Sequence, residues 1–145
     1  MTGVEVEKLE CLQANIAEAV LAITGQSNKE QIKNVERLVG MFDLNFLHLV
    51  QRLAYILATI QHETANTFLP IEEYGKGKGK EYGKIVEETG KAYYGRGLVQ
   101  ITWSYNYKKF NGLIGIDLYQ NPEQALNPEI ALQIAYYGMQ SGSVS

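Results

Sequence analysis

The sequence predicts a mainly α-helical domain with a small β-hairpin, and three observations support this fold class. Apolar residues recur at helical spacing over residues 5–60, a segment rich in glycine, tyrosine and lysine covers residues 64–97, and two Asn-Pro-Glu triplets follow. The chain has 145 residues, of which 46% are hydrophobic and 20% are charged, as is usual for one globular domain. We therefore expect a single domain over residues 1–145 with one buried core.

The first two helices are indicated by periodicity and by end signals. Residues 5–24 carry apolar side chains three and four positions apart, and Gly25 then offers a stop. Ser27, with Glu30 three residues later, is typical of a capping box and predicts a second helix that ends near Gly40.

A third helix is expected to run from a cap at Asp43 to about His62. Apolar residues occupy nearly every side of it, which predicts the buried central helix of the domain. The change of composition over residues 64–97 predicts a small hairpin with loops, and the functional surface is expected there. The second Asn-Pro-Glu triplet, residues 127–129, predicts the start of a helix that ends at about Tyr137.

Charge and cysteine content exclude several classes of protein. The 13 basic and 16 acidic side chains give a net charge of −3, so no overall basic field attracts nucleic acid or a membrane surface. Residues 76–109, however, carry 8 basic and 3 acidic side chains, which suits contact with an anionic polymer. The single cysteine, Cys11, excludes an intrachain disulfide and a multi-cysteine metal site.

Export and membrane signals are not expected. Three glutamates lie in the first ten residues, where a signal peptide needs a basic and then an apolar stretch. The most apolar stretch, residues 44–60, contains polar and charged residues and does not read as a membrane span. We expect synthesis in the cytoplasm, with action on the cell wall after release or delivery.

Three carboxylates near the expected hairpin point to acid–base chemistry. Glu63 lies where an apolar helix ends, and both the helix dipole and apolar walls favour its protonated form, as a general acid requires. Glu72 and Glu73 follow a break at Pro70 that turns the chain back. Neighbouring side chains of an extended segment point to opposite faces, so one of the two is expected to face Glu63, and spacing does not choose between them. Two carboxyls about 6.5–9.5 Å apart suit glycoside hydrolysis with inversion.

Two segments carry a family resemblance. Residues 62–72, HETANTFLPIE, resemble the catalytic signature of bacterial and phage members of glycoside hydrolase family 19, in which a second glutamate lies nine residues after the first. Residues 93–107, YYGRGLVQITWSYNY, are similar to a second signature of that family almost position for position. The resemblance implies a lysozyme-like, mainly helical α+β fold, with the hairpin bordering a sugar-binding cleft. It also implies an inverting mechanism and substrates made of β-1,4-linked amino sugars.

The resemblance also implies residue roles. Glu63 is the general acid, Glu72 is the base that activates water, and Thr102 helps to hold that water; Glu73 has no role. Three further positions match residues that line the family's sugar cleft: Gln100, Tyr105 and Asn106.

Other candidates have two interpretations each. Trp103 is either a core residue or a flat face for a sugar ring. Arg96 either pairs with a carboxylate or braces a loop. His62 is not expected to bind metal, because the chain's other histidine, His48, does not complete a site; no metal or cofactor is expected. The alternating lysines of residues 76–80 match no phosphate-binding motif and are expected to be solvated, with a role in steering the protein to an acidic wall polymer.

The leading hypothesis is therefore a peptidoglycan hydrolase of the endolysin or lysozyme type. A chitinase acting on N-acetylglucosamine polymers is the first alternative, and a non-catalytic cell-wall-binding module is the second. Family members are expected to continue beyond the helix at residues 128–138, so the resemblance implies that the C-terminal part is missing or that a second chain completes the fold. Ala65 and Asn66 replace the family's Gly-Gly pair, and a different turn is expected there.

Overall fold

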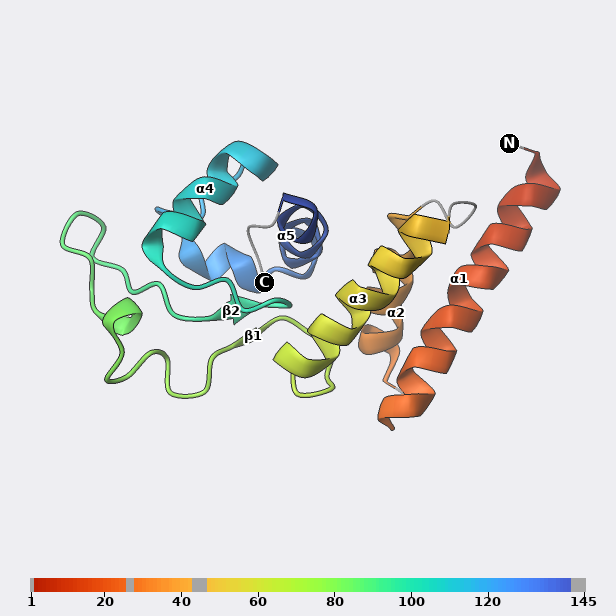
Figure 1. The fold of residues 1–145 in the computed structure, drawn as a ribbon, viewed down its shortest axis with the longest axis horizontal. Coiled ribbons are helices and arrows are strands. Elements are labelled where there is room, and N and C mark those ends of the chain that lie inside the picture. Colours follow the sequence, from red (N-terminus) through yellow and green to blue (C-terminus); the bar gives the residue numbers. More distant parts are fainter. Residues whose placement is uncertain (1, 26–27, 43–46, 142–145) are drawn as a thin grey trace.

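The computed structural model describes residues 2–25, 28–42 and 47–141. Within them the chain forms a mainly α-helical fold with one small antiparallel sheet, which confirms the predicted fold class (Figure 1). The elements in chain order are α1 (Gly3–Thr24), α2 (Lys29–Gly40), α3 (Leu47–Glu63), β1 (Ile71–Glu72), the 3-10 helix η1 (Glu81–Gly83), β2 (Arg96–Gly97), α4 (Ser104–Ile114), the 3-10 helix η2 (Pro122–Leu126) and α5 (Pro128–Ser141).

The ends of α1 and α2 follow from local side-chain chemistry. Thr2 and Glu5 form a reciprocal capping box at the start of α1, and Gly25 ends the helix in the left-handed conformation, with φ at 70°. Asn28 caps α2 through a box with Gln31. The predicted box with Ser27 is thus displaced by one residue, and Ser27 itself lies outside the described residues. Asn28 is extended and its side chain reaches the first free N–H groups of the helix.

Helix α3 is less enclosed than its sequence suggests. Leu53, Ile56 and Ile60 are buried, but Val50 is 38% exposed and Tyr55 is 62% exposed. Only one face of the helix therefore belongs to the core, although apolar residues occupy nearly every side of it. The predicted cap at Asp43 lies outside the described residues.

Helix α5 joins the parts of the molecule, because it contacts α2, α3 and α4. It starts where predicted, with the Asn127 side chain accepting the Glu129 N–H, and continues four residues beyond Tyr137 to Ser141. A core pair shows how α5 meets the region after α2, where the rings of Phe42 and Tyr136 pack edge to face at 5.1 Å.

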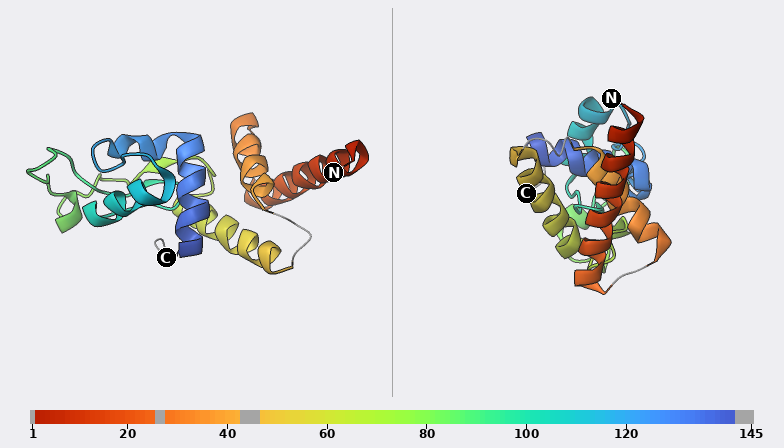
Figure 2. Two further views of the ribbon diagram at one scale, coloured as in Figure 1. Left: turned by 90° about the horizontal axis from the view of Figure 1, so that it is seen from above. Right: turned by 90° about the vertical axis from the view of Figure 1, so that its right-hand side faces the viewer.

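Helices α1 and α2 pack together, and α1 lies at one end of the molecule, far from the sheet (Figures 1 and 2). The long segment between the two strands extends at the opposite end (Figure 1). No helix in the described part of the chain is both long and apolar enough to cross a membrane.

The hairpin predicted between residues 64 and 97 is present as the β1–β2 sheet. Its register pairs Ile71 with Gly97 and Glu72 with Arg96. Gly97 has φ at 91°, and a Cβ there would lie 2.9 Å from the Ala125 carbonyl oxygen, so glycine is required for both reasons. The sheet brings residues after α3 against residues just before α4.

Candidate active site

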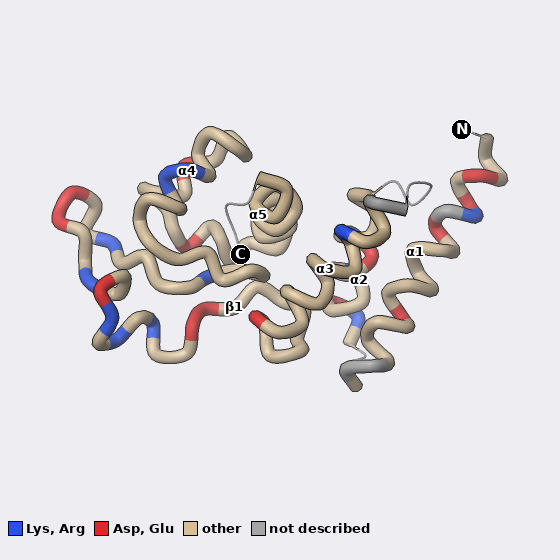
Figure 3. Tube along the Cα trace, viewed as in Figure 1, with Lys and Arg blue, Asp and Glu red and all other residues tan. Residues whose placement is uncertain are grey.

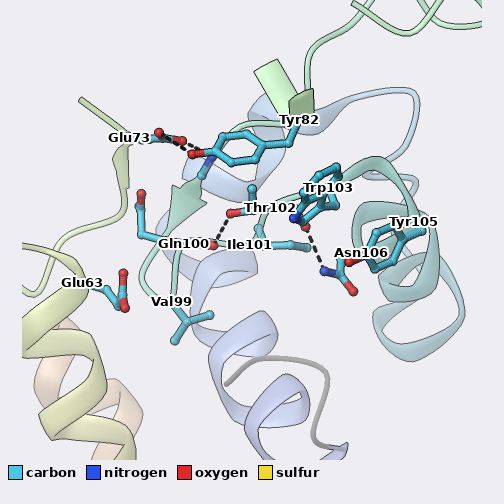
Figure 4. A pocket seen from close by; sticks show the side chains of 11 residues that line it. Glu63, Glu73, Tyr82, Val99, Gln100, Ile101, Thr102, Trp103, Tyr105 and Asn106 are labelled. Carbon is cyan, nitrogen blue, oxygen red and sulfur yellow. Dashed lines mark hydrogen bonds between the residues drawn. The ribbon is translucent and has the colours of Figure 1, made fainter. Parts of the chain in front are cut away.

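A cavity of about 520 Å³ opens between the end of α3, the sheet and the start of α4 (Figure 4). It is lined by Glu63, Glu73, Tyr82, Gly95, Val99, Gln100, Ile101, Thr102, Trp103, Tyr105 and Asn106. This set includes all residues predicted for catalysis or sugar binding except Glu72. The structure thus gathers side chains that are up to 43 positions apart in the chain into one site.

Glu63 is the last residue of α3, and its half-buried side chain lines the cavity. Its carboxylate makes no hydrogen bond or ion pair to any other described residue. The next residue anchors its backbone: the buried Thr64 hydroxyl donates to the Ile60 carbonyl at 2.7 Å and accepts the Phe68 N–H at 3.0 Å. Glu63 therefore combines a fixed backbone with a free carboxyl group.

The turn after Glu63 has a backbone that glycine adopts without cost. Ala65 has φ at 50° and Asn66 has φ at 66°, both in the left-handed region. Asparagine is tolerated there, whereas alanine is strained by its Cβ. The pair that replaces Gly-Gly thus occupies a glycine-like turn, at a cost in stability for Ala65.

Glu73 faces the same cavity and is held at both carboxylate oxygens. Its Oε1 accepts the Tyr82 phenol at 2.9 Å, and its Oε2 accepts the Gly95 N–H at 3.0 Å. The Glu73 N–H in turn donates to the Gly95 carbonyl at 2.7 Å, next to the sheet. The bond to the carboxylate also raises the pKa of Tyr82, so this phenol keeps its proton as a donor. Glu73 is thus a fixed carboxylate with lone pairs left for further donors.

Glu72 lies outside the residues that line the cavity. Its carboxylate pairs with the Lys76 ammonium at 2.7 Å, accepts the Tyr94 phenol at 2.8 Å and lies 3.7 Å from the Arg96 Nε. The hydrogen bond from Lys76 is the main cause that lowers the pKa of Glu72, against the opposing effect of burial. This carboxylate belongs to a polar cluster beside the sheet.

The two neighbours therefore point to different surroundings, as alternation in an extended segment predicts, but the one in the cavity is Glu73. The role of Glu72 as the base, which the family resemblance implies, stays a prediction; of the two neighbours, Glu73 is the one that lines the cavity with Glu63. The physical reason is the register of the sheet, which pairs Glu72 with Arg96 and leaves Glu73 beside Gly95.

Thr102 lies in the cavity between two residues with a left-handed backbone, Gln100 at φ 52° and Trp103 at φ 73°. Its hydroxyl donates to the Gln100 carbonyl at 2.8 Å, so its oxygen lone pairs remain able to accept a hydrogen bond from water. Such conformations in residues other than glycine are costly and cluster at functional sites.

The two amide side chains of the cavity have their nitrogen atoms engaged within the protein. The Gln100 Nε2 donates to the carbonyls of Ile71 and Gly97, which ties its loop to both strands. The Asn106 Nδ2 donates to the Thr102 carbonyl at 2.8 Å, as Figure 4 shows. Gln100 and Asn106 therefore position the site as well as line it, and their amide oxygens are the groups available to a sugar.

Exposed aromatic rings form one side of the site. Trp103 is 41% exposed and Tyr105 is 63% exposed, and their rings stack at 6.1 Å with an interplanar angle of 24°. Tyr82 packs edge to face on Trp103 at 5.5 Å. Of the two interpretations of Trp103, exposure favours the flat surface for a sugar ring over the core.

Arg96 is a brace and not a cavity residue. It is buried, and its Nη1 donates to the Ala92 carbonyl at 3.1 Å and to the Tyr107 hydroxyl at 3.2 Å. Its guanidinium carbon lies 3.7 Å from the centre of the Tyr94 ring. Of the two expected roles, bracing of the backbone accounts for these contacts, and its nearest carboxylate is Glu72.

His62 is exposed and does not line the cavity. No cluster of three or more His, Cys, Asp or Glu side chains suited to a metal ion occurs among the residues that the structure describes.

Tyr82 lines the cavity and is not among the candidates that the sequence indicates. It comes from η1, inside the loop between the strands, and no motif marks it. The sequence signal for this loop is the cluster of glycines around Tyr82. The cluster indicates a tightly folded loop, but it does not show that the Tyr82 phenol donates to Glu73.

Known proteins match this chain over the region that contains the cavity residues. The family model described as chitinase class I, of glycoside hydrolase family 19, matches residues 55–142. An endochitinase of Arabidopsis thaliana is 37% identical over 89 residues, which cover 60% of this chain and 31% of the relative. The acidic endochitinase SP2 of Beta vulgaris is 39% identical over 80 residues, or 51% of this chain and 27% of the relative. The endochitinase A2 of Pisum sativum is 46% identical over 50 residues, or 34% of this chain and 15% of the relative.

The matched regions thus span less than a third of each of these relatives. No solved structure gives a significant match to this chain.

Proposed function

The chain belongs to glycoside hydrolase family 19, the class I chitinases, and on this premise we propose that it hydrolyses β-1,4 bonds between amino sugars. The observation that carries the proposal is the pair Glu63 and Glu73 in one cavity, next to exposed aromatic rings and amide oxygens. Two carboxyls that flank a sugar–sugar bond are the usual requirement of this reaction.

Glu63 is the proposed general acid. Its carboxyl group has no partner among the described residues, so nothing inside the protein competes with the glycosidic oxygen for its proton. Protonation of that oxygen lets the leaving sugar depart as a neutral alcohol. The fixed turn at Thr64 holds the carboxyl at the end of α3, where it meets the cavity.

Glu73 is the proposed general base, in place of Glu72. Bonds from the Tyr82 phenol and the Gly95 N–H hold its carboxylate and leave lone pairs that can accept a proton from water. The Thr102 hydroxyl oxygen accepts a hydrogen bond from the second O–H of that water. The water oxygen attacks the anomeric carbon as the bond to the leaving oxygen breaks, one proton passes to Glu73 and one leaves Glu63, and the configuration inverts.

Glu72 has a different role in this proposal. Its ion pair with Lys76 and its contact with Arg96 engage it in the cluster beside the sheet. A carboxylate held by two cations is a weak base, because both cations favour its ionised form.

We propose peptidoglycan as the polymer, with action at the cell wall. Chitin is the second candidate, and the observation in its favour is that the relatives are named endochitinases. Both polymers contain β-1,4-linked N-acetylated amino sugars, so the same two carboxyls serve either reaction.

The test compares the wild type with Glu63→Gln on purified peptidoglycan and on N-acetylglucosamine oligomers. New reducing ends, and soluble fragments identified by mass spectrometry, are expected from the wild type, with a loss of at least about 100-fold in Glu63→Gln. Fragments from peptidoglycan alone support the wall polymer, and fragments from the oligomers alone support chitin. Binding to peptidoglycan without release of any fragment would instead establish a non-catalytic wall-binding module.

A further inference from the structure

A lysine-rich loop directly follows the proposed base. We define the basic loop as residues 74–84, which carry Lys76, Lys78, Lys80 and Lys84 against a single acidic residue, Glu81. Figure 3 shows blue segments gathered along this part of the chain, beyond β1. The loop starts next to Glu73 and returns to the cavity at Tyr82, so Lys76, Lys78 and Lys80 lie in the chain between two residues that line the cavity.

The basic loop is folded tightly by its own backbone. The N–H groups of Lys76, Lys78 and Lys80 donate to carbonyls three residues earlier, at 2.9–3.0 Å. Gly77 and Gly83 touch, since a Cβ on Gly77 would lie 2.6 Å from the Gly83 Cα. The lysines therefore project from a defined frame, which lowers the entropy lost when they bind a partner.

Two of the four ammonium groups have no acidic partner. Lys76 pairs with Glu72 and Lys84 pairs with Glu81, both at 2.7 Å. Lys78 and Lys80 are exposed and form no ion pair with any carboxylate of the described residues. The loop thus presents two exposed positive charges without an acidic partner among the described residues, in the segment that joins Glu73 to Tyr82.

The two candidate polymers differ in charge. Chitin is uncharged, whereas the peptide stems of peptidoglycan carry free carboxylates beside the sugar chain. Resting on the proposed function, we propose that Lys78 and Lys80 bind stem-peptide carboxylates and so select anionic peptidoglycan over uncharged amino-sugar polymers. Exposed ion pairs are individually weak and are screened by salt, so the effect depends on both lysines and on ionic strength.

The experiment measures co-sedimentation with insoluble peptidoglycan that is free of teichoic acid, before and after its carboxylates are converted to amides. The double variant Lys78→Gln/Lys80→Gln is compared with Lys29→Gln/Lys33→Gln, which removes the same charge from exposed positions of α2. At 50 mM salt we expect the loop variant to bind untreated peptidoglycan about fivefold more weakly than the wild type. We expect the control variant to match the wild type.

On amidated peptidoglycan the three proteins should bind equally, and salt of about 0.5 M should remove the difference on the untreated polymer. Equal binding of the loop and control variants to untreated peptidoglycan would overturn the inference. It would also be overturned if the loop variant bound amidated peptidoglycan more weakly than the wild type by the same factor as it binds the untreated polymer. Because sedimentation does not require hydrolysis, a wild type that binds in this way but releases no fragments would contradict the proposed hydrolase and leave the role of the basic loop standing.

Discussion

The Tyr82 phenol donates a hydrogen bond of 2.9 Å to the Glu73 carboxylate, across a loop that starts at one residue and returns at the other. The Gly95 N–H occupies the second carboxylate oxygen. The loop between the strands therefore helps to form the cavity, because its Tyr82 phenol holds the Glu73 carboxylate in place. Tyr82 is a positioning residue in the proposed reaction.

Replacing Tyr82 with phenylalanine removes the donor and keeps the ring that packs on Trp103. A hydrogen bond to a charged group contributes about 1.5–3 kcal/mol, and partial exposure at this site reduces that value. We expect kcat for oligomer hydrolysis to fall about tenfold, with KM little changed and the melting temperature lowered by only about a few degrees, so that the protein stays folded in the assay. Steady-state kinetics measure kcat and KM, and thermal unfolding measures the melting temperature.

Tyr74→Phe is the matched control, because the Tyr74 side chain is fully exposed and lies outside the cavity. It should behave as the wild type. A Tyr82→Phe variant with unchanged kcat, or one that loses stability in proportion to activity, would show that the phenol does not position the base.

Ala65→Gly should stabilise the protein. Ala65 has φ at 50°, where a Cβ costs about 1–2 kcal/mol, and part of the gain is offset by the added freedom of glycine in the unfolded chain. We expect the free energy of unfolding in urea to rise by about 1 kcal/mol. Gly25→Ala tests the same argument in reverse, because Gly25 has φ at 70° in open space and should lose about 1 kcal/mol. A loss of stability in Ala65→Gly would refute the assigned turn.

Arg96→Lys should destabilise the fold although it keeps the charge. One ammonium does not reproduce the two bonds of the Arg96 Nη1 together with the stacking on Tyr94. We expect a loss of about 2 kcal/mol in urea unfolding. Arg52→Lys, at an exposed position of α3, should change stability by less than about 0.5 kcal/mol. Equal effects of the two substitutions would contradict the bracing role.

The Glu72 cluster should make stability depend on pH in the acid range. Because Lys76 lowers the pKa of Glu72 below its ordinary value of 4.5, the ionised carboxylate stabilises the folded state above that pH. The stabilisation is lost as pH falls through the lowered pKa. The melting temperature of Glu72→Gln should therefore lie below that of the wild type at pH 7, and the gap should narrow below about pH 4.5. A gap that stays constant across this range would exclude ionisation as its cause.

Much of the helical framework could be predicted because its signals are local. The glycine stop at Gly25 and the Asn127 cap act within one turn of the chain, and both lie where the sequence indicates. Helix α4 was not predicted, because the residue before it, Trp103, has φ at 73° and gives the helix no side-chain cap. Its start depends on contacts with the sheet, such as the Trp103 N–H bond to the Tyr93 carbonyl at 2.8 Å.

The cavity could be predicted except for the choice between two adjacent glutamates. Alternation indicates that one of Glu72 and Glu73 faces Glu63, but the register that selects it depends on pairing with residues more than twenty positions away, at Gly95 and Arg96. The role of Tyr82 depends on the same non-local fold. Short-range spacing carries no information on either point.

The most direct test of the proposed site compares Glu73→Gln with Glu72→Gln in the rate of reducing-end release at pH 7, with the folded fraction of each protein measured by circular dichroism. Glutamine keeps the size of the side chain and removes the base. The proposed mechanism predicts a loss of at least about 100-fold for Glu73→Gln and a change of less than about threefold for Glu72→Gln. The opposite order, with Glu72→Gln inactive and Glu73→Gln active, would contradict the assignment of Glu73 as the base.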